Sequence, residues 1–226
     1  MSQRPTIRVY VDGQNLFRRA LKGSPYLWLD VARLCSAVLP RYEVSRVAYF
    51  TAEVRPAPHD LHAAARHRRY LQALGGHPLI DVHLGHFRRD VVRMPLHPWD
   101  ITADGHPKTV LVKRTLEKGS DVNLATQLLW DAMHEKDDAY AVLTNDSDLV
   151  APIRMLRDSG RAEVGVIFPT SNTARSLVAA GSWFRVLRES TLARCLLPER
   201  VIDVHGSVVQ QPPEWKNQRP QNSLGP

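Results

Sequence analysis

The chain has 226 residues, 43% of them hydrophobic, which is enough for one substantial domain with its own core. Its 30 lysine and arginine residues exceed its 23 acidic residues, and the net charge of +7 favours an anionic partner, most commonly nucleic acid. No segment reaches the roughly 18 uninterrupted apolar residues of a membrane span, and the first residues, MSQRPTIRV, lack the apolar stretch of a secretion signal. These features exclude a membrane-spanning protein and predict a cytoplasmic location.

Apolar runs and helical patterns alternate along the chain. Runs rich in Val, Ile, Tyr or Phe predict strands at residues 7–11, 44–51, 79–84, 139–144 and 164–168. Helices are expected at residues 28–39, 60–74, 120–134, 149–158 and 173–180. Continuous apolar runs suit a parallel sheet that is covered on both faces. The alternation therefore predicts an α/β three-layer domain with a mostly parallel central sheet flanked by helices.

Two segments depart from this alternation. Residues 87–116 contain the extended stretches RRDVVRM and KTVLVKRTL on either side of a Pro-rich connection, so an insertion is expected there, with a hairpin as one form. Residues 206–226 are rich in Pro, Gln and Asn and have no periodicity, which predicts a disordered tail. The sequence thus predicts one domain at residues 1–205.

The cysteine and histidine residues do not form a metal-binding pattern. Cys35 and Cys195 lie far apart and belong to no C-x-x-C pair, so neither a zinc knuckle nor a disulfide framework is indicated. The paired histidines of DVHLGH and HDLH have no matching second pair at zinc spacing. We therefore expect the two cysteines to be buried small apolar side chains.

Two of the predicted strands run directly into aspartates. Asp12 follows the first strand in IRVYVDGQN, and Asp146 and Asp148 follow the fourth strand in LTNDSDL. A turn is the simple alternative, because Asn, Asp and Ser side chains bond their own backbone where strands end. In an extended segment, residues two apart point to the same side, so Asp146 and Asp148 are expected to face one site.

A further aspartate begins the helix predicted at residues 120–134, where Ser120 is the expected N-cap. Asp121 lies within roughly 40° of the apolar face of that helix and is expected to point toward the sheet. The alternative is that its charge only stabilises the helix N-terminus. Ligands of parallel sheets bind outside the carboxyl ends of the strands, where crossover helices begin, so Asp121 is expected to converge with Asp12, Asp146 and Asp148.

Converging carboxylates repel one another unless a cation or protons neutralise them. Mg²⁺ and Mn²⁺ prefer oxygen ligands and leave room for a substrate phosphate. The predicted cofactor is therefore Mg²⁺ or Mn²⁺, and the predicted chemistry is metal-assisted phosphoryl transfer.

Three stretches, VYVDGQNLF, KGSDVNLATQLL and LTNDSDLVAPIRMLRDSGRAEVGV, together resemble the motifs of NYN-domain ribonucleases in the PIN-like nuclease superfamily. The resemblance implies a PIN-like fold that hydrolyses RNA phosphodiester bonds with Mg²⁺ or Mn²⁺. Its acidic positions match Asp12, Asp121, Asp146 and Asp148. Asn15 is expected to orient a metal-bound water or a substrate phosphate, and Thr144 and Ser147 are expected to contact phosphate or support the loop. The chain departs from the family at Asn145, which replaces a common glycine, and at Gly181 or Ser182, where a late acid is common.

Basic residues cluster near and within residues 87–116, where a substrate clamp is a reasonable expectation, with solvated surface as the alternative. Lys118 is the residue most expected to contact phosphate. The other candidates in that part of the chain are Arg88, Arg89, Lys113 and Arg114. RNA is the expected partner, and a homo-oligomer or a protein bound through the C-terminal tail stays open.

Three functions remain open. The leading one is a metal-dependent ribonuclease that leaves 5′-phosphate and 3′-hydroxyl ends. A second is a phosphatase of the haloacid dehalogenase type with Asp12 as nucleophile, although the usual D-x-D is DGQ here. The third is an RNA-binding or regulatory module with the same fold and weak or no catalysis.

Overall fold

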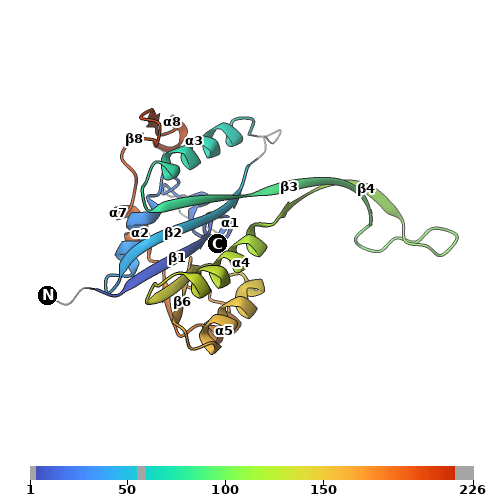
Figure 1. Cartoon of the computed structure of the whole chain (residues 1–226). Coiled ribbons are helices and arrows are strands. Elements are labelled where there is room, and N and C mark those ends of the chain that lie inside the picture. The colour runs from blue at the N-terminus through green and yellow to red at the C-terminus, as the bar shows by residue number, and fades with distance from the viewer. Residues whose placement is uncertain (1–3, 55–59, 217–226) are drawn as a thin grey trace.

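The computed structural model describes residues 4–54 and 60–216, except for the side chains of residues 87–89 and 115–118 (Figure 1). Its main sheet has seven strands in the order β4-β3-β2-β1-β5-β6-β7. All neighbouring pairs are parallel except β3 with β4. The strands are β1 (Thr6–Asp12), β2 (Glu43–Ala52), β3 (Ile80–Pro95), β4 (Thr109–Lys118), β5 (Ala139–Leu143), β6 (Glu163–Phe168) and β7 (Trp183–Val186).

Helices cover both faces of this sheet because the strands bury apolar side chains on both sides. One core cluster joins the sheet to the helices α2 (Val31–Val38), α3 (Ala63–Gly75) and α7 (Glu189–Arg194). The other joins it to α4 (Ser120–His134), α5 (Val150–Asp158) and α6 (Arg175–Ala180). Val9 and Val11 belong to the first cluster and Tyr10 to the second, as side-chain alternation along β1 requires. The predicted α/β three-layer fold with a mostly parallel sheet is confirmed.

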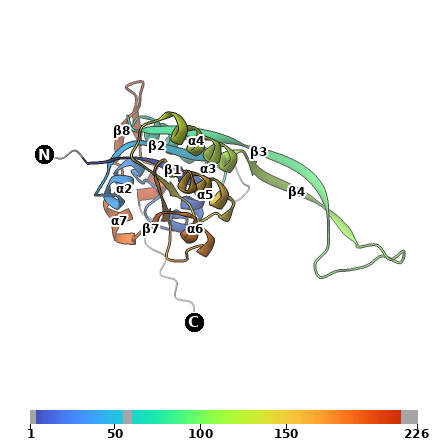
Figure 2. The ribbon, with the colours of Figure 1, turned by 60° about the horizontal axis from the view of Figure 1, so that its bottom comes forward.

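The segment predicted as an insertion or hairpin is an antiparallel ribbon. Strand β3 continues past its parallel pairing with β2, and its outer half pairs with β4 from His86 opposite Lys118 to Pro95 opposite Thr109. Both views show this ribbon projecting far from the three layers (Figures 1 and 2). We call residues 86–118 the arm.

The prediction of a disordered tail from residue 206 is wrong for the part of it that the structure describes. Strands β8 (Arg200–Ile202) and β9 (Val208–Gln210) form a small antiparallel sheet, and α8 (Pro213–Lys216) follows. Val209 is 3% exposed, and the ring of Trp215 lies 6.2 Å from that of Trp28. Val209 and Trp215 hold this otherwise polar segment to the core. The overall composition of the segment does not indicate these two contacts. Residues 217–226 lie outside the described residues.

Other expectations meet mixed outcomes. Cys35 and Cys195 are free and buried, as predicted. Strand β7, at the edge of the sheet, was not predicted from its sequence. Within the described ranges, no helix combines the length and the apolar character needed to cross a membrane.

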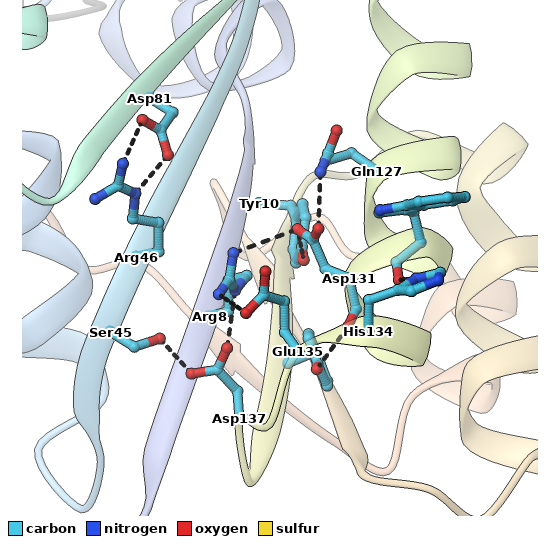
Figure 3. A network of polar contacts seen from close by, with 12 residues as sticks. Arg8, Tyr10, Ser45, Arg46, Asp81, Gln127, Asp131, His134, Glu135 and Asp137 are labelled. Atoms are coloured by element: carbon cyan, nitrogen blue, oxygen red, sulfur yellow. Dashed lines mark hydrogen bonds and ion pairs between the residues drawn. The ribbon is translucent and has the colours of Figure 1, made fainter.

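A polar network joins α4 to the opposite end of β1 from its aspartate (Figure 3). The carboxylate of Asp131, buried on α4, accepts hydrogen bonds of 2.7 Å from the hydroxyl of Tyr10 and 2.7 Å from Nε2 of Gln127. The Arg8 guanidinium lies 3.6 Å from Asp131 and donates a 2.8 Å bond from Nε to Asp137. One cation thus neutralises two buried carboxylates and fixes α4 against the sheet.

We expect Arg8→Met to lower the free energy of unfolding by about 3–5 kcal/mol, because it leaves two buried carboxylates without their cation. Urea denaturation near neutral pH measures this change. The matched control is Arg46→Met, whose pair with Asp81 is 42% exposed on both side chains and is worth less than about 1 kcal/mol. Equal losses in the two variants would contradict a stabilising role for the buried network.

Candidate active site at the carboxyl edge of the sheet

Asp12 ends β1 and is held in a fixed orientation although it is only 5% exposed. It caps α1 (Gly13–Leu16): its Oδ1 accepts a 2.9 Å hydrogen bond from the backbone N–H of Asn15. Its Oδ2 accepts a 3.0 Å bond from the hydroxyl of Thr144. Both carboxylate oxygens are therefore engaged, which is how the fold tolerates a charge in this position.

The ends of β1 and β5 are tied together by side chains. The Thr144 hydroxyl also accepts a 3.0 Å bond from the N–H of Asp146, and Oδ1 of Asn15 accepts a 3.0 Å bond from the N–H of Asn145. Thr144 is fully buried and its hydroxyl is engaged with Asp12 and Asp146, which favours the loop-support role among the two that were expected. Asn15 is half-buried at this edge.

The loop after β5 is a turn of 3₁₀ helix, η2 (Ser147–Leu149), and not the extended segment that was predicted. Asp146 caps this turn, since its Oδ1 accepts a 3.0 Å hydrogen bond from the N–H of Asp148. Asp148 and Ser147 are both exposed on the turn. The alternation argument for Asp146 and Asp148 fails because a helical turn rotates successive side chains by about a third of a circle.

Two of the predicted acids act on the carboxylate of Asp12. The pKa of Asp12 is raised from an ordinary value of 3.8 to about 6, mainly by burial, and the charges of Asp121 and Asp146 add to the increase. The hydrogen bonds from Asn15 and Thr144 oppose it. Asp121 and Asp146 therefore each lie near enough to the carboxylate of Asp12 to repel its charge.

Helix α4, which carries Asp121, has a different N-cap from the one predicted. Its N-cap is Gly119, with φ of 99°, a conformation that L side chains rarely adopt. Ser120 is the first helical residue, and its buried hydroxyl has no hydrogen-bond partner among the described residues. This hydroxyl beside Asp121 is a polar group that the sequence indicated only as a cap.

The donor set has the chemistry of a site for a hard cation. Its groups are carboxylates, a hydroxyl and an amide, which Mg²⁺ and Mn²⁺ accept. Within residues 4–54 and 60–216, no three His, Cys, Asp or Glu side chains are grouped closely enough to form a complete metal site. Mg²⁺ and Mn²⁺ commonly keep several water ligands and bind through one or two carboxylates.

Some predicted residues fall outside this picture. The side chain of Lys118 lies outside the described residues, although its backbone pairs with His86 at the base of the arm. Asn145 has a structural role that the sequence did not reveal: its Nδ2 donates to the carbonyl of Asn172 and its Oδ1 accepts from the N–H of Ala174. The hydroxyl of Ser182 accepts a hydrogen bond from the N–H of Val164, at the amino end of β6. An acid at position 182 would therefore lie at the opposite edge of the sheet from Asp12.

A cavity of about 340 Å³ lies beside Asp12 and was not predicted. We call it the aromatic cavity, after four of its lining residues, Phe17, Tyr49, Tyr70 and Trp215. These come from β2, α3, α8 and the π-helical turn η1 (Phe17–Leu21), four segments that are distant in sequence. No local pattern marks such a site.

The architecture and the acidic edge define a PIN-like fold of the nuclease type. The NYN domain family matches residues 6–188, and the chain therefore belongs to that family.

Two individual proteins are similar to this chain. It is 29% identical over 242 residues to the 6-hydroxy-3-succinoylpyridine 3-monooxygenase HspA of Pseudomonas putida (strain DSM 28022 / S16), which covers 93% of this chain and 75% of that protein. The crystal structure of VPA0982, a protein of unknown function from Vibrio parahaemolyticus RIMD 2210633, has a TM-score of 0.52 at 17% identity. It covers 87% of this chain and 100% of that chain, and supports the fold.

We expect Asp12→Asn to raise the free energy of unfolding by about 2–3 kcal/mol at pH 7.5 with a chelator present. The folded-state pKa of Asp12, about 6, lies above its ordinary value of 3.8, so ionisation destabilises the folded wild type progressively as pH rises between these values. Asparagine cannot ionise and keeps the shape of the side chain. Denaturant unfolding of both proteins at pH 4 and 7.5 measures the difference.

The gain should disappear near pH 4, where the wild-type carboxyl is largely protonated in the folded state. Asp158→Asn is the control, since Asp158 is exposed at the end of α5 and should show no such pH-dependent difference. A gain of the same size at both pH values, or a loss at pH 7.5, would refute the account of Asp12.

Proposed function

We propose that this protein is a metal-dependent ribonuclease acting at the carboxyl edge of its sheet. The observation that supports the proposal is that the charges of Asp121 and Asp146 both act on the buried carboxylate of Asp12, in a chain that belongs to the NYN domain family. NYN domains typically act on RNA, and the net charge of +7 suits that substrate. Cleavage is expected to leave 5′-phosphate and 3′-hydroxyl ends.

The residues of the site have separable roles in this proposal. Asp12, Asp121 and Asp146 would hold Mg²⁺ or Mn²⁺, with Asp148 as a ligand from the exposed turn. The bound cation would stabilise negative charge on the phosphate and favour ionisation of the attacking water. Asn15 and Thr144 orient Asp12 and the loop of Asp146, so the acids are positioned before substrate arrives.

The hydroxyls nearest the acids complete the proposed site. Ser147 is exposed on the turn between Asp146 and Asp148, and its hydroxyl would donate to a phosphate oxygen. The buried hydroxyl of Ser120 adjoins Asp121 and would bond a water or phosphate at the head of α4. Lys118, which precedes Gly119 at the foot of the arm, is proposed to contact phosphate.

The first test is cleavage of a panel of single-stranded and structured RNAs with Mn²⁺, Mg²⁺ or chelator. We expect Asp146→Asn to lower the cleavage rate by roughly 100-fold or more, because it weakens cation binding at the centre of the site. Asp158→Asn, purified identically, should keep the wild-type rate. Mn²⁺ should also raise the melting temperature of the wild type more than that of Asp146→Asn, which reports cation binding independently of activity.

An unchanged cleavage rate in Asp146→Asn would remove the proposed catalytic site. RNA binding without cleavage by the wild type would favour a regulatory module with the same fold. An aspartyl-phosphate trapped on Asp12 would favour the phosphatase alternative.

The arm is proposed as a clamp for the RNA backbone. Arg93 and Lys113 are both exposed and share one face of the ribbon, because Arg93 pairs with Leu111 and Lys113 with Val91, two positions along the ladder. Arg114 lies on the other face, opposite Asp90. Arg93 and Lys113 therefore present two neighbouring cations to a phosphate chain.

We expect the double variant Arg93→Gln with Lys113→Gln to bind all RNA sequences several-fold more weakly. The slope of log affinity against log salt should fall by about 0.7 for each phosphate that the variant no longer neutralises. Filter binding at several salt concentrations measures both quantities. The control is Lys136→Gln with Arg161→Gln, which removes the same charge from exposed positions before β5 and β6, at the far edge of the sheet. Equal effects would show that net charge alone matters.

A second candidate function is monooxygenation of a small heteroaromatic compound. It is favoured by the aromatic cavity together with the name of the relative in Pseudomonas putida, a monooxygenase for a substituted pyridine. Such a reaction would place one atom of O₂ in the product and release the other as water. A reduced nicotinamide would supply the two electrons as hydride, and solvent would supply the second proton. Incorporation of ¹⁸O from ¹⁸O₂ into 6-hydroxy-3-succinoylpyridine in the presence of NADH would support this function.

A further inference from the structure

The aromatic cavity shares a wall with the acidic site. A Cβ added to Gly13, the residue after Asp12, would lie 2.5 Å from Cζ and 2.7 Å from the hydroxyl of Tyr49. Only glycine leaves room for this ring so close to the backbone. Burial raises the pKa of Tyr49, and the negative charge of Asp12 raises it further, as expected for a phenol near that carboxylate. A ligand in the cavity would therefore adjoin the carboxyl edge.

Aromatic rings form much of the cavity surface. Tyr70 is buried and donates a 2.8 Å hydrogen bond to the carbonyl of Leu29, and Trp215 packs edge-on against it with ring centres 6.1 Å apart. Phe17 is 43% exposed and begins the π-helical turn, in which the N–H of Lys22 donates to the Phe17 carbonyl at 2.7 Å. Fixed rings inside and an accessible ring outside suit a planar ligand.

The charged groups of the cavity differ in what they already bind. Arg66 is engaged, because it pairs with Asp60 and lies 3.6 Å from Glu214. Arg18 is exposed, and its guanidinium donates a 3.0 Å bond to Oε1 of Gln14, which is uncharged. Among these two arginines, Arg18 would therefore stabilise an anionic group of a ligand more strongly.

His67 contributes a neutral polar group. Burial lowers its pKa to about 4, so the imidazole is uncharged near neutral pH. Its Nδ1 accepts a 3.4 Å bond from the N–H of Val54, which leaves the ring hydrogen on Nε2 as a donor. A neutral donor is suited to a ring nitrogen or carbonyl oxygen.

We propose that the aromatic cavity binds one planar heteroaromatic ring that carries an anionic group, with the ring against Phe17, Tyr49 and Trp215 and the anion on Arg18. The volume of about 340 Å³ is near the lower end of the range for small-molecule sites, so the cavity accepts one ring system at a time. The ring is either a nucleotide of the RNA substrate or a free heteroaromatic acid. The assignment to a nucleotide beside the cleaved bond rests on the proposed ribonuclease function, whereas ring binding itself does not.

The test is calorimetric titration of the full chain, in chelator, with uridine 5′-monophosphate, adenosine 5′-monophosphate and pyridine-3-carboxylate. Inorganic phosphate supplies the anion without a ring, and uridine supplies a ring without the anion. Ala63→Trp fills the cavity from the start of α3, and Ala65→Trp is its matched control because Ala65 is exposed on the same helix and does not line the cavity.

At least one ring-bearing anion should bind the wild type and Ala65→Trp alike, and Ala63→Trp should lose this binding by at least about 10-fold. Phe17→Ala should weaken it by about 5- to 160-fold, the range measured when an aromatic ring that stacks on a base is removed. Arg18→Gln should weaken the anions several-fold and leave uridine unaffected. Thermal unfolding of each variant checks that it is folded.

Binding of the nucleotides alone identifies the RNA source, and binding of pyridine-3-carboxylate alone identifies a free acid. Either result supports the proposal even if no RNA is cleaved, which separates it from the ribonuclease function. The proposal is overturned if no ring-bearing anion binds the wild type, if phosphate alone binds equally well, or if both Ala63→Trp and Phe17→Ala bind like the wild type.

Discussion

The fold is organised around one carboxylate that it buries at the end of its central strand. Water would solvate Asp12 better than the protein does, and its raised pKa is the measure of that cost. The bonds from Asn15 and Thr144 do not remove the cost; they fix the direction in which the charge acts. A group kept ionised against its environment, near two other acids, is an arrangement that a cation or substrate can relieve.

The parallel sheet explains why this edge holds so many chemical groups. Every parallel strand ends there, so residues that follow β1, β2 and β5 meet although the chain between them is long. The acidic site, Ser120 and the aromatic cavity all draw on these ends. The arm extends from this edge as a direct continuation of the sheet, because the single strand β3 pairs first with β2 and then with β4.

The sequence predicted what depends on apolar pattern. The strands of the inner sheet were found within one or two residues, apart from the outer half of β3, and α4 was found at its observed bounds. Patterning failed for β7, an edge strand only partly buried, and for residues 208–216, where few apolar residues act as anchors. It failed in both cases because burial there depends on neighbours distant in sequence.

Residues of the site also divide into those that local sequence predicts and those whose position depends on neighbours distant in sequence. Strand order and helix starts were enough to expect Asp12, Asp121 and Asp146 at one edge. They could not predict that Thr144 is fully buried, that Asn145 ties the loop to residues 172–174, or that η2 turns Asp148 away from an extended path. The aromatic cavity needed four distant segments, so no spacing rule could locate it.

Helix α4 connects the polar network at the amino ends of the strands to Asp121 at their carboxyl ends, so a movement at one end of the helix is transmitted to the other. Its far end is bonded to β1 through Asp131, and Asp121 stands ten residues away, about 15 Å along the helix axis. If the helix pivots at Asp131, a tilt of about 4° displaces Asp121 by roughly 1 Å, and an error of that size can cost about 100-fold in rate. Under the proposed function, loosening the polar network would therefore lower the reaction rate, although no residue of the network touches the substrate.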